Sequence, residues 1–392
     1  MTYDPFAPEV MADPAEAGRR LAGCPVHRFD GVEPPFWTLS HHRDVLSALR
    51  DPATFSSRFG QGMHYTEEHS MKSDAPVHTF FRKLVRKAFT PRAVAQMEPR
   101  IERIVAELLD GFAGRGEADL YQAFASPLPT IVIAEMLGVP ARDTGRFKGW
   151  SDAWVAAMGS PDPEAFAPRI AEMREYLLEH VLRRQELEAS GRGLPDDLIS
   201  GLVLAEEDGE RLTAEDVVNV VRQLLVGGNE TTSSLITNAL VRLTERPSLL
   251  QGMAGDPSLV ERIVEESLRY DSPVLGLFRT TTRTVELHDS VIPEGAKVML
   301  HYGAANRDPL VFSDPGRFDV DRDAQELRSH LAFGFGPHVC LGAALSRLEG
   351  RIALRQIAER LPGLVLAAPP ERVTPFLLWG KRSLPARWTL GE

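Results

Sequence analysis

A long helical stretch, residues 214–246, constrains the fold more than any other feature of this sequence. Thr213 and Asp216 form a capping-box pattern at its start, and Pro247 ends it. Apolar residues recur at helical spacing in four shorter stretches, 101–112, 119–137, 141–158 and 165–188. We therefore expect a mainly helical fold between about residues 40 and 270.

The two ends of the chain differ from this helical middle. The first 35 residues read as loop, because prolines stand at positions 5, 8, 14, 25, 34 and 35. After Tyr270, short strand patterns such as TRTVELH and AKVMLHY predict small sheets, and a last long helix is expected over 341–361. No repeat or flexible linker interrupts the sequence, so we expect one domain over residues 1–392.

Composition narrows the class of protein. Of the 392 residues, 43% are hydrophobic and 25% are charged, as in globular proteins with a large core. A net charge of −11 argues against binding nucleic acid over the whole surface. No apolar run is long enough to span a bilayer, and the acidic, proline-rich start lacks the features of a signal peptide. We expect a cytoplasmic protein that contacts neither membrane nor nucleic acid.

The segment FGFGPHVCLG, residues 333–342, holds Cys340, one of two cysteines. A disulfide with Cys24 is not expected in a reducing compartment, and Cys24 reads as a small buried residue or a surface thiol. The N-terminus of the helix expected after Cys340 would stabilise a thiolate. A thiolate here could serve as nucleophile, zinc ligand or haem ligand. His338 alone is a poor zinc partner, and no signature of a nucleophilic site accompanies the cysteine.

The long helix contains a second unusual segment, VGGNETTSS, residues 226–234. Each of its two adjacent glycines costs about 1 kcal/mol relative to alanine in a helix interior. Strain in mid-helix often marks a functional site. The alternative is a close helix crossing, where glycines let two backbones approach.

Both segments resemble the cytochrome P450 superfamily. The cysteine segment matches the haem-binding pattern F-x-x-G-x-H-x-C-x-G at Phe333, Gly336, His338, Cys340 and Gly342. Residues 227–232 resemble the A/G-G-x-D/E-T-T/S sequence of the family's oxygen-binding helix. The resemblance implies a mainly α fold with small β-sheets, a triangular helical prism around a buried haem.

The resemblance also implies roles in the cysteine loop. The cofactor would be haem b, with the Cys340 thiolate as the proximal iron ligand. Backbone N–H groups after Cys340 would hydrogen-bond the sulfur, Phe333 would pack beside it, and Gly342 belongs to the same cofactor-binding loop. His338 would approach a haem propionate; its alternative is a loop histidine that caps its own backbone.

On the long helix, the resemblance assigns oxygen activation to three residues. The turn at Gly228 would make room for dioxygen, Thr231 would hydrogen-bond it, and Glu230 would relay protons from water. The alternatives are a surface charge for Glu230 and a hydroxyl bonded to its own helix for Thr231.

Two further segments match the family at the haem edge. His78 and Arg82 lie four residues apart in a segment that resembles the family's H-T-x-x-R element, whose side chains bind haem propionates. Arg279 is the matching third propionate ligand. A guanidinium suits this task because its donors match a carboxylate two at a time.

A buried ion-pair network is implied behind the haem. Glu266 and Arg269, three residues apart on one helical face, match the family's E-x-x-R. Arg317 is expected as the third, arginine member, although Gly316 stands where the family often has a polar residue. We expect these residues to hold the scaffold of the cysteine loop.

A basic stretch follows His78. No acidic residue stands between positions 75 and 97, and this stretch contains Arg82, Lys83, Arg86, Lys87 and Arg92. On an acidic protein it is a candidate docking site for an electron donor, a ferredoxin or flavodoxin-type protein supplied by an NAD(P)H-dependent reductase. The alternative is a solvated face without a partner.

The substrate side is implied more loosely. The resemblance places the pocket among the loop 59–74, the long helix and a set of apolar residues, Trp150, Trp154, Met158, Val274, Leu275, Leu277, Phe376 and Leu377. Their character suggests a hydrophobic substrate, although such residues also form ordinary core. Arg58, His64 or Lys72 would anchor a substrate carboxylate.

The function implied is that of a haem-thiolate monooxygenase, expected to act as a monomer. It would use dioxygen and two electrons to insert one oxygen atom into a hydrophobic small molecule, by hydroxylation or by dealkylation after hydroxylation. The alternatives are a haem-thiolate peroxygenase or oxidative-coupling enzyme, and, from a different class, a non-catalytic haem-binding sensor.

Overall fold

Helices dominate the computed structural model, which describes residues 3–390 apart from 22, 68, 161, 208 and 254. The longer helices are α3 (His42–Arg50), α4 (Val77–Arg86), α6 (Glu98–Asp110), α7 (Pro127–Leu137), α8 (Thr144–Gly159), α9 (Ala167–Ala189), α11 (Ala214–Glu245), α13 (Pro257–Tyr270) and α16 (Ala343–Arg360). The shorter ones are α1 (Pro8–Ala12), α2 (Pro14–Leu21), α5 (Pro91–Gln96), α10 (Leu198–Val203), α12 (Pro247–Gly252), α14 (Tyr302–Ala305) and α15 (Ala324–Arg328).

The largest sheet joins the two halves of the chain. Its strand order is β1 (Val26–Phe29), β2 (Phe36–Leu39), β10 (Lys297–Leu300), β7 (Leu277–Thr281) and β3 (Phe55–Ser56). β10 runs parallel to β2 and antiparallel to β7. The other strands form small sheets: β4 (Glu117–Asp119), β5 (Glu206–Glu207), β6 (Glu210–Arg211), β8 (Val285–Leu287), β9 (Ser290–Ile292), β11 (Val365–Leu366), β12 (Glu371–Arg372), β13 (Lys381–Ser383) and β14 (Pro385–Arg387).

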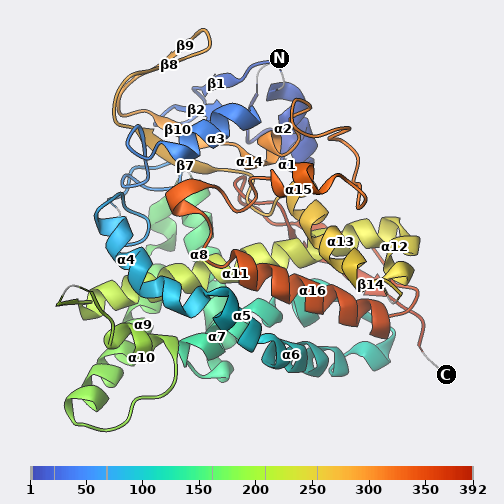
Figure 1. The fold of residues 1–392 in the computed structure, drawn as a ribbon. Coiled ribbons are helices and arrows are strands. Elements are labelled where there is room, and N and C mark those ends of the chain that lie inside the picture. Colours follow the sequence, from blue (N-terminus) through green and yellow to red (C-terminus); the bar gives the residue numbers. More distant parts are fainter. Residues whose placement is uncertain are drawn as a thin grey trace.

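α11 is the central helix, and it runs across the molecule beneath the large sheet (Figure 1). The predicted capping box is present: Asp216 N donates to Thr213 Oγ1 at 3.1 Å, and Thr213 N donates to the Asp216 carboxylate at 3.0 Å. The helix packs against α7, α8, α9 and α16, which together bury most of its second half. It therefore provides a rigid wall for anything bound beside it.

The predicted mainly α fold with small sheets is confirmed, whereas the loop predicted over the first 35 residues is wrong. α1 and α2 begin at Pro8 and Pro14, where a missing N–H costs nothing because first-turn donors have no helical partner. Their prolines therefore start helices instead of breaking them. Among the described residues, no helix is long and apolar enough to cross a bilayer.

Candidate active site

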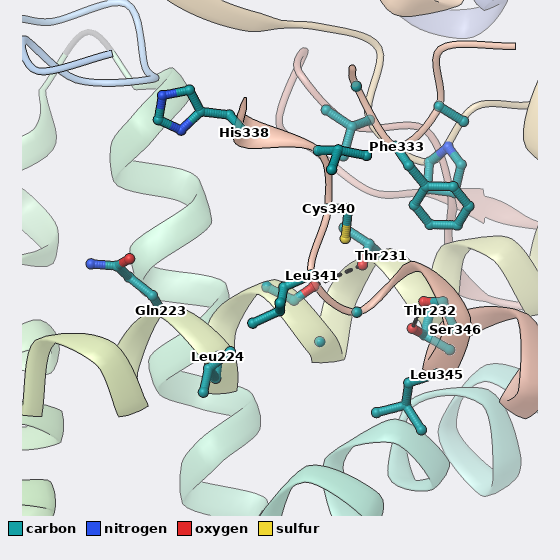
Figure 2. Close-up of a pocket in the computed structure, with 18 of the residues that line it drawn as sticks. Gln223, Leu224, Thr231, Thr232, Phe333, His338, Cys340, Leu341, Leu345 and Ser346 are labelled. Atoms are coloured by element: carbon teal, nitrogen blue, oxygen red, sulfur yellow. Dashed lines mark hydrogen bonds between the residues drawn. The ribbon is translucent and has the colours of Figure 1, made fainter. Parts of the chain in front are cut away.

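A cavity of about 300 Å³ lies between α11 and the loop that carries Cys340. In Figure 2 the Cys340 Sγ points towards the helix that bears Thr231. Most of the lining is apolar, including Ile133, Leu224, Leu235, Phe333, Leu341 and Leu345. Residues from distant parts of the sequence thus meet around one thiol.

Backbone geometry fixes the position of that thiol. Gly336 has a φ of 73°, and a Cβ on it would lie 2.6 Å from the Leu49 carbonyl oxygen, so only glycine fits. Cys340 N donates to Phe333 O at 2.9 Å, which closes the loop just before α16. The predicted start of the last helix is confirmed to within two residues.

The surroundings of Cys340 have opposing effects on the pKa of its thiol. Burial raises the pKa of the thiol, while a backbone hydrogen bond from Gly342 and the cations Arg82 and Arg347 lower it. The accessible surface of the side chain faces the cavity. A metal cation placed there would favour the thiolate, although no cluster of three or more His, Cys, Asp or Glu suited to a metal occurs within the described residues.

Four predicted propionate ligands meet at one edge of the cavity. The rings of His78 and His338 lie 4.2 Å apart between centroids, and Arg82 donates to Val339 O at 2.6 Å. Arg279 is buried on β7 and lines the same edge. His78 Nε2 is buried without a hydrogen-bond partner. Burial first, and then the nearby Arg279, lower the pKa of His338 to about 3.

These residues fit a haem. The group has a flat apolar ring, two carboxylates on one edge and an iron that needs an axial ligand. The cavity has apolar walls, a cationic edge with an orphaned donor on His78, and one thiol, Cys340. The carboxylates would satisfy the orphaned donor and neutralise the guanidinium groups of Arg82 and Arg279.

The glycine pair on α11 leaves open space. A Cβ on Gly227 would meet nothing within 4 Å, and one on Gly228 would only reach Ile133 at 4.0 Å. Both glycines line the cavity and α11 stays helical through them. The alternative of a close helix crossing is therefore wrong. The space lies beside Thr231, whose Oγ1 donates to Gly227 O at 2.8 Å (Figure 2). The alternative of a hydroxyl bonded to its own helix is therefore what the structure shows for Thr231.

Glu230 is buried, with 5% of its surface exposed, so the alternative of a surface charge is wrong. Its Oε2 lies 3.4 Å from Lys148 Nζ on α8, and Lys148 also contacts the Asp152 carboxylate. Burial raises the pKa of Glu230, while Lys148 opposes the shift. The group is therefore easier to protonate than an ordinary glutamate, as a proton relay requires.

The ion-pair network behind the cavity has an unexpected third member. Arg269 Nε and Nη2 donate to the two oxygens of Glu266 at 2.7 and 2.6 Å, and both side chains are fully buried. The arginine side chain that joins them is Arg322, whose Nε lies 3.3 Å from Glu266. Arg317 is exposed and contributes only its carbonyl, which accepts from Arg269 and Arg322. The prediction of the Arg317 side chain is therefore wrong, because the turn directs it to solvent.

The basic stretch is divided between interior and surface. Arg82 donates a hydrogen bond to Val339 O of the Cys340 loop, and Lys83 forms an ion pair with Glu207 at 2.9 Å. Arg86, Lys87 and Arg92 are exposed. The docking prediction therefore rests on these last three.

Only part of the predicted substrate set lines the cavity. Gln61, Met71 and Lys72 of the loop 59–74 line it, as do Val274 and Leu277; residue 68 of this loop lies outside the described residues. The other apolar candidates lie outside the described lining, and several belong to packed core: Trp150, Trp154, Met158, Leu275, Phe376 and Leu377.

Sequence patterns missed several lining residues. Gln223, Leu224, Tyr302 and Glu349 carried no signal apart from helical spacing or strand neighbours. The Oε2 of Glu349 is buried without a partner, and burial raises the pKa of its carboxyl to about 8. It is therefore neutral in neutral solution.

Comparisons with known proteins agree with this geometry. The family model "Cytochrome P450" matches residues 23–362. Cytochrome P450 107B1 of Saccharopolyspora erythraea is 41% identical over 90% of this chain and 89% of its own, and erythromycin C-12 hydroxylase of the same species is 40% identical over 89% and 88%. The solved structure of CYP109Q5 from Chondromyces apiculatus superposes with a TM-score of 0.87, at 38% identity and over 100% and 99% of the two chains.

The thiol held by the glycine loop, the cationic cavity edge and these matches lead to one assignment. The chain belongs to the cytochrome P450 family, the haem-thiolate monooxygenases in which a cysteine binds the iron.

Proposed function

We propose that this monooxygenase oxidises a hydrophobic molecule of the secondary-metabolite class. The observation that carries the proposal is the largely apolar wall between Cys340 and Thr231, since apolar walls bind apolar ligands by removing their surface from water. Erythromycin C-12 hydroxylase, to which the chain is similar over most of its length, is named for such a substrate. Hydroxylation of a C–H bond is the expected reaction.

The chain's own residues would position the cofactor and move protons. Bound through Cys340, haem supplies the activation of dioxygen. Arg82, Arg279 and the two histidines would orient its carboxylates. Gly342 N–H would hydrogen-bond the sulfur, which tunes how strongly the thiolate donates electrons.

Proton handling falls to two neighbours on α11. Thr231 Oγ1 donates its proton to Gly227 O, so its lone pairs are left to act as acceptors. In the cavity the hydroxyl would therefore accept a hydrogen bond from a protonated reactant. Glu230 would receive protons on the side that faces α8, where Lys148 contacts both Glu230 and Asp152. It would then transfer them towards the cavity. Such a relay supports a dioxygen-dependent enzyme over one driven by peroxide alone.

Electrons would come from a separate ferredoxin or flavodoxin-type protein. Arg86 ends α4, the helix whose Arg82 contacts the Cys340 loop, and Lys87 follows it directly; both cations are exposed. Phe335 and Val339 of this loop are also exposed, and Arg50 Cζ lies 4.7 Å from the Phe335 ring. An apolar centre with cations around it suits an acidic partner.

The test is a screen of macrolides, polyketides and polar controls against the purified haem protein. Displacement of water from the iron shifts the Soret band, so binding is read optically. Turnover under labelled dioxygen should then place one labelled oxygen atom in the product. A panel in which only polar compounds bind, or a product without label, would contradict the proposal.

A further inference from the structure

We infer that Tyr302 is a further haem-binding residue, whose hydroxyl group donates a hydrogen bond to a carboxylate of the cofactor. Sequence patterns gave no sign of this tyrosine, and it is not one of the propionate ligands expected at the cavity edge. The inference follows from the position of the hydroxyl, from the chemistry of its neighbour Arg279 and from its protonation state. It does not depend on which substrate is oxidised.

Tyr302 lies at the junction between the largest sheet and the cavity. It begins α14 just after β10, and Val298 of β10 pairs with Arg279 of β7. The residue is buried, with 3% of its surface exposed, and it lines the same cavity as Arg279, Gly334 and His338. A Cβ placed on Gly334 would lie 4.0 Å from the hydroxyl oxygen. The hydroxyl is therefore next to the cysteine loop, at the cationic edge of the cavity.

The hydroxyl group has a proton that the protein does not use. Arg279 acts on Tyr302 through its positive charge and through a side-chain hydrogen bond. Because a guanidinium group only donates, the phenolic oxygen is the acceptor in this bond. Within the part of the chain that the structure describes, the hydroxyl itself donates to no acceptor. A buried hydroxyl in this state is unfavourable, since it has lost its hydrogen bond to water.

Tyr302 is a neutral donor and not an anion. Burial raises the pKa of its phenol above the usual value of 10.0, and the nearby Arg279 opposes only part of this shift. An ionised phenolate would pair with Arg279 by itself and would have no proton to donate. Because the phenol stays neutral, it does not compensate the charge of Arg279, and its proton remains available to an anion.

One carboxylate can satisfy both groups. Each carboxylate oxygen has two lone pairs, so a single carboxylate can accept from Arg279 and from Tyr302 together. The carboxyl of the described lining is that of Glu349, and burial raises its pKa to about 8, so it is neutral near pH 7. Haem would bring two carboxylates to this edge, where His78 Nε2 also lacks a partner. The edge thus offers two unused donors, from α4 and from the start of α14.

The experiment removes the hydroxyl alone, in Tyr302→Phe, and keeps the aromatic ring. Transfer of haem from the purified holoenzyme to excess apomyoglobin should become about tenfold faster or more. A hydrogen bond to a charged group is worth about this factor in affinity, and such changes act mainly on dissociation. Resonance Raman spectra give a second readout, because the bending bands of the haem propionates shift with hydrogen bonds to their oxygens. These bands should shift in the variant.

Tyr176→Phe is the matched control. Its hydroxyl donates to Asp143 at 2.9 Å outside the described cavity lining, so its loss should change neither the transfer rate nor the Raman bands. A folded Tyr302→Phe protein that purifies without haem would support the inference, as an extreme case of faster release. Transfer no faster than in the wild type, unchanged propionate bands, an equal effect of Tyr176→Phe, or loss of helical circular dichroism in Tyr302→Phe would overturn it. The last result would assign the hydroxyl to the protein core.

Discussion

At the scale of single residues, the Thr231 hydroxyl is expected to determine whether electrons from NADH end in product or in hydrogen peroxide. Its proton is committed to Gly227 O, and the residue lines the cavity together with the glycine pair. Thr231→Ala should keep the fold and the haem but release several times more hydrogen peroxide per NADH consumed. Thr231→Ser, which keeps the hydroxyl, is the control. Peroxide assay with a bound substrate measures the effect, and unchanged coupling in the alanine variant would remove Thr231 from proton handling.

Glu349 gives a prediction about pH. The folded protein keeps the proton on this carboxyl to about pH 8, whereas an unfolded chain loses it near its ordinary pKa of 4.5. Stability due to this group therefore falls as the pH rises between those values, by about 1.4 kcal/mol for each unit of pKa difference. Glu349→Gln removes the titration, so the melting temperature of the variant minus that of the wild type should increase from about pH 5 to about pH 8.

Thermal unfolding of the haem protein at both pH values measures this change. Glu261→Gln on α13 is the control, because Glu261 is exposed and its pair with Arg351 lies at the surface. A difference for Glu349→Gln that stays constant with pH would show that the carboxyl is ionised in the folded protein.

At the scale of elements, the ion-pair network joins α13 to the segment that precedes the cysteine loop. Glu266 accepts from Arg269 on its own helix, and from Asp319 N at 2.8 Å and Arg322, so one carboxylate ties α13 to the segment 319–322. Removing one partner of a buried pair leaves a buried charge unsatisfied and costs about 3–5 kcal/mol.

Arg322 and Arg317 form a matched pair for testing this network. Arg322→Met should lower the free energy of unfolding by about 3–5 kcal/mol, whereas Arg317→Met should change it by less than about 0.5 kcal/mol, because its side chain is exposed. Denaturant unfolding of the two variants measures both values. Equal destabilisation would mean that the two side chains share the role.

The difference between Arg322, which joins the network, and Arg317, which was expected to join it, shows what can be predicted from sequence. The cysteine loop, the glycine pair and Glu266–Arg269 were predictable because each is a short local pattern that resembles a pattern of the cytochrome P450 family; spacing by itself indicated only the Glu266–Arg269 pair, whose members share one face of a helix. Arg322 was missed because it lies in an irregular turn five residues after Arg317. In such a turn the sequence spacing does not determine which of the two arginine side chains points inward to Glu266. Lys148 was missed because nothing in its own helix shows which residue of α11 it will face.

At the scale of the whole molecule, charge is distributed unevenly. The chain carries a net charge of −11, yet Arg86, Lys87 and Arg92 are exposed in the stretch beside the Cys340 loop. The overall charge repels an acidic electron donor, and this local patch would orient the donor towards the face nearest the thiolate. Such steering acts mainly on the rate of association and weakens as salt is added.

Replacing Arg86 and Lys87 together by glutamate should slow reduction by an acidic ferredoxin by about tenfold or more at low ionic strength, because attraction becomes repulsion. Stopped-flow reduction, followed across a salt series, should show the wild-type and variant rates converging as screening shortens the range of the field. Arg183→Glu, on the exposed surface of α9, adds negative charge away from the patch and should have a small effect. A rate that falls in both variants in proportion to the charge changed, four charges in the double variant and two in Arg183→Glu, would show that net charge, and not this patch, governs the encounter; a rate unchanged in both would place the donor on another face.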